Sequence, residues 1–248
     1  MELNFLFFIT VIPAIILFGI SKAGLGGSIA LISIPLMTTV MPLGQALAIT
    51  LPILIFSDFV AMYKFRKNFD LDTLKLIIAG SSIGIVIGAV TFKFFSDDML
   101  KFIVGIMGFL FTTHYFFLKK DKNKASNKSN LKGGFFSIIS GFTSFCVHAG
   151  GTPLSVYLLP LRLQKESYVG TRVIYFTFVN LFKLPIYMYL SMISFESFQY
   201  SIMLMPVAII GILIGYQLVK RVEEKLFYNV LYTLIFISSS KLIYDFFI

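Results

Sequence analysis

Long apolar runs separated by short polar stretches dominate this 248-residue chain and leave no room for a soluble catalytic domain. Several runs reach the roughly 20 residues that a helix needs to cross a bilayer. Only 13% of the residues are charged, against about 25% in soluble domains. The sequence therefore predicts an all-α polytopic membrane protein. The apolar segments fall at residues 5–40, 45–63, 74–94, 98–118, 133–160, 168–190, 197–219 and 226–247.

The net charge of +9 does not indicate a nucleic-acid partner, because the Lys and Arg residues lie mostly in the loops between apolar segments. That distribution is the topology signal of a membrane protein. The single cysteine, Cys146, excludes an internal disulfide. We expect no cleavable signal peptide, because Glu2 stands where a basic region is required.

The polar stretch at residues 119–132 divides the chain into two halves, residues 1–118 and 133–248, with four apolar segments each. The halves look duplicated, because similar residues recur at offsets of 122 to 127. Internal repeats are the usual construction of secondary transporters. The alternative is a chance likeness between glycine-rich membrane helices. The matching residues are Asp58 and Asn180, Gly84 and Gly211, and Gly88 and Gly215.

The first segment of each half is interrupted by a polar, glycine-rich stretch. Residues 21–28 (SKAGLGGS) interrupt the first segment, and residues 148–153 (HAGGTP) interrupt the fifth. Glycine and proline break helices. Broken backbone inside a membrane is tolerated only where it is buried in protein or lines a cavity. Both interruptions are therefore expected to point inward.

Two topologies fit these segments, and loop charge distinguishes them. If every segment is a full span, the two halves are parallel. If segments one and five are re-entrant hairpins, three spans remain in each half and the second half is inverted. With the basic linker in the cytoplasm, the inverted arrangement places 15 basic residues inside and two outside, whereas the parallel one gives 10 and seven. The positive-inside rule favours the inverted repeat with a broken or re-entrant first segment in each half.

A new helix is expected to start after each Gly-Gly pair, with Ser28 or Thr152 in its first turn. A helix N-terminus presents unpaired N–H groups and about half a positive charge. Two such ends meeting near the bilayer midplane would bind an anion without a catalytic side chain; alternatively, the glycines are only packing kinks. The predicted substrate-binding residues are Lys22, Gly24, Gly26, Gly27, Ser28, Asp58, His148, Gly150, Gly151, Thr152, Asn180 and Lys183.

Lys22 and His148 in the interruptions, and Asp58 within the second segment, are ionisable residues that are costly to bury and are therefore candidates for function. Lys22 lies in the first interruption and is expected either to attract an anion or to neutralise Asp58. His148 lies in the second interruption. It could donate a hydrogen bond to substrate or carry a proton, or it could be a hydrogen-bonded structural histidine.

The sixth segment carries three further polar residues. Asn180 stands opposite Asp58 in the repeat and could coordinate substrate or bridge helices. Arg172 and Lys183 could extend to a membrane interface along their apolar stems. We favour that interpretation for Arg172 and keep Lys183 as a candidate for the site.

Enzyme chemistry finds little support in the sequence. The two histidines, His114 and His148, have no second ligand at metal-binding spacing. No Ser-His-Asp set, phosphate-binding loop or dinucleotide fingerprint is present. We therefore expect no enzymatic activity, no metal and no cofactor.

Four stretches resemble the sulfite exporter TauE/SafE family of membrane permeases. GISKAGLGGSIALISIPLM (19–37) and QALAITLPILIFSDF (45–59) are similar to its first half. SGFTSFCVHAGGTPLSVYLLPLRL (140–163) and VGTRVIYFTFVNLFKLPIY (169–187) are more similar still. The chain departs from the family pattern at Thr152, where proline is expected, and at Arg172, where a small or polar residue is commoner. These departures bear on the identity of the substrate.

The resemblance implies a secondary transporter of the bacterial inner membrane for a small sulfur-containing anion, such as sulfite or an organosulfonate. Its expected partners are that anion and membrane lipid, and a coupling proton or ion and a homo-oligomer are further possibilities. An anion channel that uses the same helix ends is one alternative. A membrane scaffold without transport activity is another.

Overall fold

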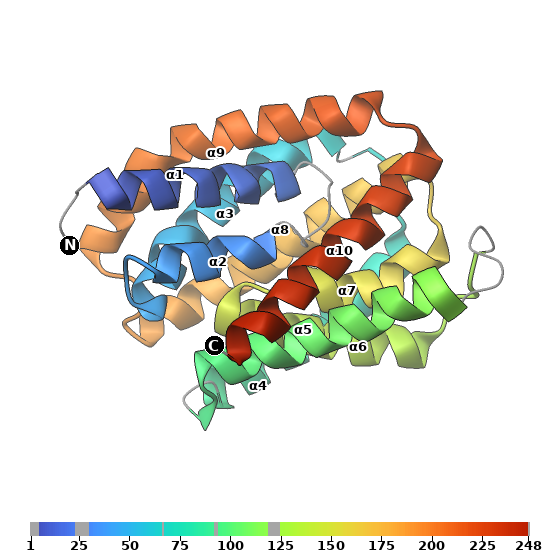
Figure 1. Ribbon diagram of the computed structural model, residues 1–248, viewed down its shortest axis with the longest axis horizontal. Coiled ribbons are helices and arrows are strands. Elements are labelled where there is room, and N and C mark those ends of the chain that lie inside the picture. The colour runs from blue at the N-terminus through green and yellow to red at the C-terminus, as the bar shows by residue number, and fades with distance from the viewer. Residues whose placement is uncertain (1–4, 23–29, 66, 92–93, 119–124, 248) are drawn as a thin grey trace.

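The computed structural model describes residues 5–22, 30–65, 67–91, 94–118 and 125–247, and every regular element in this part of the chain is helical. Most helices run along the long axis of the molecule (Figure 1). A π-helical turn, His114–Leu118, and a 3₁₀ turn, Leu159–Leu161, extend two of them. The helices are α1 (Phe5–Ile20), α2 (Ala30–Thr38), α3 (Leu43–Phe65), α4 (Leu71–Thr91), α5 (Asp97–Thr113), α6 (Asn130–Val147), α7 (Gly151–Leu158), α8 (Lys165–Tyr189), α9 (Phe195–Arg221) and α10 (Glu224–Phe246).

Three helices in the described residues are long and apolar enough to cross a membrane: Leu43–Tyr63 within α3, all of α4, and all of α9. Two shorter apolar helices, Phe5–Ile20 and Phe102–Phe117, accompany them. The prediction of an all-helical membrane protein is confirmed. The helices outside this set are shorter or more polar, and α8 carries buried Arg172 and Lys183.

The second predicted interruption lies within the described residues, whereas residues 23–28 of the first lie outside them. The first segment ends as α1 at Ile20 and resumes as α2 at Ala30. The fifth ends as α6 at Val147, passes through His148 in the left-handed conformation (φ 53°), and resumes as α7 at Gly151. In each case the two pieces pack against each other, and Figure 1 shows α2 running back beside α1. The first segment of each half is therefore a hairpin of helices.

Contacts within the second hairpin show that α7 also returns along α6. The Ser140 hydroxyl of α6 donates to the Gly150 carbonyl at 2.7 Å. Nearer the start of α6, a β-carbon on Gly133 would lie 2.8 Å from the ring of Tyr157, near the end of α7. The early residues of α6 thus face the late residues of α7, as in an antiparallel pair.

Two close helix contacts hold the hairpins to the long helices: α1 packs on α9, and α6 packs on α4. Glycine makes both contacts possible, since a β-carbon on Gly84 would lie 1.9 Å from the Ile138 carbonyl oxygen. One on Gly211 would lie 2.4 Å from the carbonyl oxygen of Ile16. Such spacing lets helix backbones approach closely. The same holds in the reverse direction. A β-carbon on Gly141 would lie 2.2 Å from the Ser81 carbonyl oxygen, and one on Gly19 would lie 2.4 Å from the Ala208 carbonyl oxygen.

The loop regions that carry the basic residues lie together at one end of the molecule. Lys128, in the linker, pairs with Asp70 at 2.7 Å. The Ser126 amide donates to the Pro160 carbonyl at 2.8 Å, which joins the linker to the α7–α8 connection. Lys165 Nζ donates to the Val219 carbonyl of α9 at 3.0 Å.

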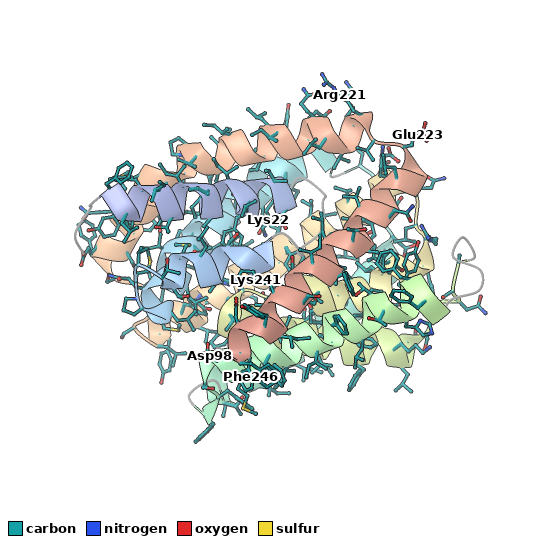
Figure 2. The ribbon with its side chains drawn as sticks, viewed as in Figure 1. Lys22, Asp98, Arg221, Glu223, Lys241 and Phe246 are labelled. Carbon is teal, nitrogen blue, oxygen red and sulfur yellow. The ribbon has the colours of Figure 1, made fainter. Side chains whose placement is uncertain are left out.

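The two chain ends lie away from these loops, towards the opposite end of the long axis (Figure 1). Figure 2 places Arg221 and Glu223 at the basic end and Asp98 and Phe246 towards the other. The linker itself is shorter than predicted. Ser129 caps α6, which begins at Asn130, so residues 130–132 belong to the helix.

Candidate functional site

A cavity of about 40 Å³ lies between the two hairpins, α3 and α8. A water needs about 10–15 Å³ by this measure, so the cavity has room for about three water-sized groups. Figure 2 shows Lys22, which lines it, about midway along the long axis. Described residues of both interruptions, Ser21 and Lys22 of the first and His148 and Gly151 of the second, therefore line one interior cavity. The wall is formed by Phe18, Ser21, Lys22, Ala30, Leu54, Ser144, His148, Gly151, Val169, Arg172, Val173, Phe176 and Asn180.

Helix α8 supplies the largest share of this wall. Its lining residues are spaced three or four apart, which places them on one face of the helix. Arg172 and Asn180 are the polar members of this face, and Phe176 lies between them. The Phe176 ring centroid is 5.0 Å from Lys22 Nζ and 5.4 Å from Arg172 Cζ, so one aromatic ring contacts both cations.

Lys22 and Asp58 form a buried ion pair, with Nζ 2.5 Å from Oδ1. The other oxygen of Asp58, Oδ2, accepts a hydrogen bond of 2.6 Å from Asn180 Nδ2. Asp58 is fully buried, and a buried carboxylate is tolerated only when it is paired and hydrogen-bonded. Of the two roles considered for Lys22, the described contacts show neutralisation of Asp58. Of those considered for Asn180, they show a bridge between α3 and α8.

Lys183 lies behind the cavity wall and has no acidic partner among the described residues. Its ammonium group lies 3.0 Å from the Ser144 carbonyl, 3.1 Å from the Ser144 hydroxyl and 2.9 Å from His148 Nδ1. His148 Nε2 lies 3.3 Å from the Leu47 carbonyl oxygen. These distances fit a neutral His148 that accepts from Lys183 at Nδ1 and donates to Leu47 from Nε2.

Arg172 is buried in the cavity wall, with 4% of its surface exposed. Our interpretation that it extends to a membrane interface is wrong. Its Nη1 donates to the Ser155 hydroxyl at 2.8 Å and to the Tyr168 hydroxyl at 3.2 Å. Among the described residues, no hydrogen-bond partner faces its Nε and Nη2 groups. These two groups form the edge of a guanidinium that binds oxoanions through two parallel hydrogen bonds.

The predicted site residues divide into four groups. Lys22, His148, Gly151 and Asn180 line the cavity. Asp58 and Lys183 lie directly behind it, bonded to lining residues, and the Gly150 carbonyl accepts from Ser140. Thr152 departs from the prediction, because it is buried against Gly108 of α5 and does not line the cavity. Gly24, Gly26, Gly27 and Ser28 lie outside the described residues.

The cavity wall carries two basic side chains, Lys22 and Arg172, and no carboxylate among the described residues. Asp58, which lies behind the cavity wall, neutralises the charge of Lys22. Arg172 has no acidic partner in the described part of the chain, so its positive charge is not neutralised there. The first residues of α2 and α7, Ala30 and Gly151, also line the cavity. Positive charge and helix N-termini together suit a small, negatively charged oxygen ligand.

Comparison with known proteins gives one match. The family model described as sulfite exporter TauE/SafE matches residues 11–242. That range includes every residue of the cavity wall and both hairpins, apart from the first six residues of α1. No curated protein sequence and no solved structure matches the chain.

Proposed function

The chain belongs to the sulfite exporter TauE/SafE family of membrane transporters, and we propose that it carries a small sulfur oxoanion or an organosulfonate, such as sulfite, across the bacterial inner membrane. The substrate binds in the cavity between the hairpins. The observation that carries this proposal is the guanidinium of Arg172, which is buried and presents Nε and Nη2 without a partner among the described residues.

Several features suit this edge of Arg172 to a sulfur oxoanion. Ser155 and Tyr168 hold Nη1, which fixes the plane of the guanidinium before any ligand arrives. Two oxygens of a sulfite or sulfonate group match the spacing of a planar fork. The start of α7 at Gly151 adds unpaired backbone N–H groups on the same cavity. The small volume favours a compact anion or the head group of a larger one.

We further infer that the two halves form an inverted repeat. The matching glycine contacts of α1 on α9 and α6 on α4 support a duplicated unit. The shared end of the basic loops supports inversion, because in a parallel arrangement residues 160–165 would lie across the membrane from the linker that they contact. An enclosed site between inverted halves is the arrangement of carriers that work by alternating access.

The test of substrate is binding by purified protein with Arg172→Lys and Arg172→Gln. Thermal shift against sulfite, sulfate, thiosulfate, taurine, isethionate and sulfoacetate identifies the best ligand, because binding stabilises the folded state by mass action. Arg172→Gln is expected to weaken the binding of that ligand by about 1.5–3 kcal/mol, the usual contribution of a hydrogen bond to a charged group. Arg172→Lys should recover part of the loss, since it keeps the charge without the fork. Arg221→Gln, exposed at the basic end, is the control.

Transport itself is tested in proteoliposomes. Saturable uptake that is accelerated by substrate on the other side identifies a carrier, whereas flux without such counterflow identifies a channel. If Arg172→Gln binds every anion of the screen as the wild type does, the cavity is not the substrate site.

Inversion is tested by single cysteines in a Cys146→Ser background. Gln164→Cys lies in the α7–α8 connection and Ser191→Cys in the α8–α9 connection, and both positions are exposed. An impermeant thiol reagent added to the periplasmic side should label position 191 only. Labelling of position 164 alone from that side contradicts the inverted repeat.

A further inference from the structure

A second cavity, of about 250 Å³, opens at the basic end of the molecule. Three lysines line it, Lys67, Lys165 and Lys220, against one acid, Glu166. Lys67, Glu166 and Lys220 are exposed, so the cavity is a vestibule that reaches the surface. Lys165 is held in place, because its Nζ donates to the carbonyls of Val219 and Val222 at 3.0 Å each. The vestibule thus carries a surplus of two positive charges in a concave wall, which concentrates small anions.

Val169 lines both the vestibule and the central cavity, and it is the one residue that the two walls share. It is fully buried. One valine of α8 therefore borders both the basic opening and the cavity that Arg172 lines one turn further along. The Val169 side chain is aliphatic, so moving it aside to connect the two spaces breaks no hydrogen bond or ion pair of that side chain.

The polar face of α8 continues from the vestibule into the interior. Lys165 lies in the vestibule, Arg172 in the central cavity, and Lys183 behind the cavity wall. Eighteen residues separate the first and last of these, which is about 27 Å along a helix. One helix thus presents cations at three depths, with Val169 between the first and the second.

The opposite side of the site offers no comparable opening among the described cavities. The large groove beside the α8–α9 connection, of about 710 Å³, is lined by apolar side chains such as Phe59, Met188 and Phe198. It shares no residue with the central cavity. Of the vestibule and this groove, only the vestibule shares a wall residue with the central cavity.

We propose that the basic vestibule is an entry site for small anions and that Val169 is the gate between it and the central cavity. This inference rests on the proposed function for its physiological meaning. The gate admits an anion when α8 rotates or shifts enough to remove one aliphatic side chain from the path. The lysines of the vestibule raise the local anion concentration at that point.

The gate is tested by the access of a thiol reagent to the central cavity. Ser21→Cys, in a Cys146→Ser background, places a thiol in the cavity wall with little change in volume. The probe is the anionic 2-sulfonatoethyl methanethiosulfonate, added from the basic end. Val169→Ala should raise its rate of reaction with Cys at position 21 by about ten-fold or more, and Val169→Leu should lower that rate.

Val179→Ala is the matched control, because Val179 is an equally buried valine of α8 that lines neither cavity. It should leave the rate unchanged. Equal acceleration by Val179→Ala would show general loosening of α8 and overturn the gate, as would an unchanged rate in Val169→Ala. Size-exclusion chromatography confirms that each variant is folded, and Val169→Thr, which keeps the branched shape, should react as the wild type does.

The charge of the vestibule is tested by Lys67→Gln with Lys220→Gln, which leaves the contacts of Lys165 intact. In the Val169→Ala background, the anionic reagent should slow by about ten-fold, and its trimethylammonium counterpart should react faster. Equal changes for both reagents would overturn the entry site. These rates do not depend on transport. If Arg172→Gln abolishes sulfite binding while Val169→Ala changes no labelling rate, the proposed function is supported and the gate is rejected. If Arg172→Gln leaves sulfite binding unchanged while Val169→Ala raises the labelling rate, the proposed function is rejected and the gate is supported.

Discussion

The two halves of the molecule agree in how their helices pack and differ in the chemistry they bring to the cavity. The contact of α1 with α9 repeats in the contact of α6 with α4, residue for residue. Ile16 and Ile138 are 122 residues apart, and so are Gly19 and Gly141. Their partners across the contacts, Gly211 against Gly84 and Ala208 against Ser81, are 127 apart.

The charged residues do not repeat in this way. With the offset of 122 that pairs Asp58 with Asn180, Arg172 corresponds to Thr50 and Lys183 to Ala61. A close backbone contact has no substitute for glycine, so both copies keep it. A buried charge is needed only once, and a second copy would add desolvation cost without a second substrate. The helix contacts therefore match between the halves, whereas the charged residues near the cavity do not.

The largest effect on stability is expected from substitution of Lys22, the basic residue that the first half contributes to the cavity wall. Lys22→Met leaves Asp58 buried with only Asn180 as a partner, and breaking a buried ion pair costs about 3–5 kcal/mol. The single cysteine, Cys146, is buried, so its reaction with a fluorogenic thiol reagent reports thermal unfolding. A fall in melting temperature of the order of 10 °C is expected for a chain of this length. Adding Asp58→Asn should recover most of it. Normal melting of Lys22→Met would show that buried Asp58 does not need Lys22 as its partner.

A smaller effect tests whether the two helix contacts are equivalent. Gly84→Ala and Gly211→Ala each force a β-carbon against a carbonyl oxygen, and such overpacking costs about 1–3 kcal/mol. The loss of stability should be larger at Gly84, where the added β-carbon would lie 1.9 Å from a carbonyl oxygen, than at Gly211, where it would lie 2.4 Å from one. Gly134→Ala, in α6, is the control, because nothing lies within 4 Å of its added β-carbon. If only one of the two substitutions lowers the stability of the protein, the two helix contacts are not equivalent.

The smallest effect concerns the linker that joins the halves. Burial raises the pKa of Asp70, but hydrogen bonds from Lys128 and Thr73 outweigh it and hold that pKa below its usual range. The pair therefore stabilises the protein above about pH 4, the pKa of an unfolded Asp, and this contribution is lost as the pH falls through the lower pKa of the folded state.

Because Lys128 and Asp70 are both partly exposed, a double-mutant cycle with Asp70→Asn and Lys128→Gln should give a coupling of less than about 1 kcal/mol at pH 7. The coupling should shrink in 1 M salt, where the Debye length is about 3 Å. A coupling that survives both high salt and low pH would contradict an ion pair and indicate a hydrogen bond between neutral groups.

Much of the architecture could be predicted from the sequence because it depends on backbone chemistry. Glycine-rich polar stretches inside apolar segments predict breaks, and α1 ends at Ile20 while α6 ends at Val147, at the predicted places. The pairing of Lys22 with Asp58 was one of two stated alternatives, because few buried charges were available to match each other. The convergence of both breaks on one cavity followed from the rule that irregular backbone in a membrane must line protein or a cavity.

The role of Arg172 could not be predicted in this way. Its distance from the start of α8, about 10 Å along the helix, is within reach of the membrane interface for a long side chain. Its actual direction depends on Ser155 in α7, which accepts its hydrogen bond only because the second hairpin folds back against the start of α8. The spacing of Arg172, Phe176 and Asn180 on one face was the available signal, since lipid-facing positions would not carry two polar residues at that period.

The bond between Asp58 and Asn180 has a consequence for how such a protein can be assembled. The two residues occupy equivalent positions and meet each other across the contact of α3 with α8. A dimer of two identical short chains would have to place the same residue on both sides. Two aspartates would meet as two negative charges without the amide that donates to Asp58 here, and two asparagines would leave both copies of Lys22 without an acid. A single polypeptide, unlike a dimer of identical chains, can place a charged residue at one of these positions and its neutral counterpart at the other, and residues 119–129 provide the covalent connection between them.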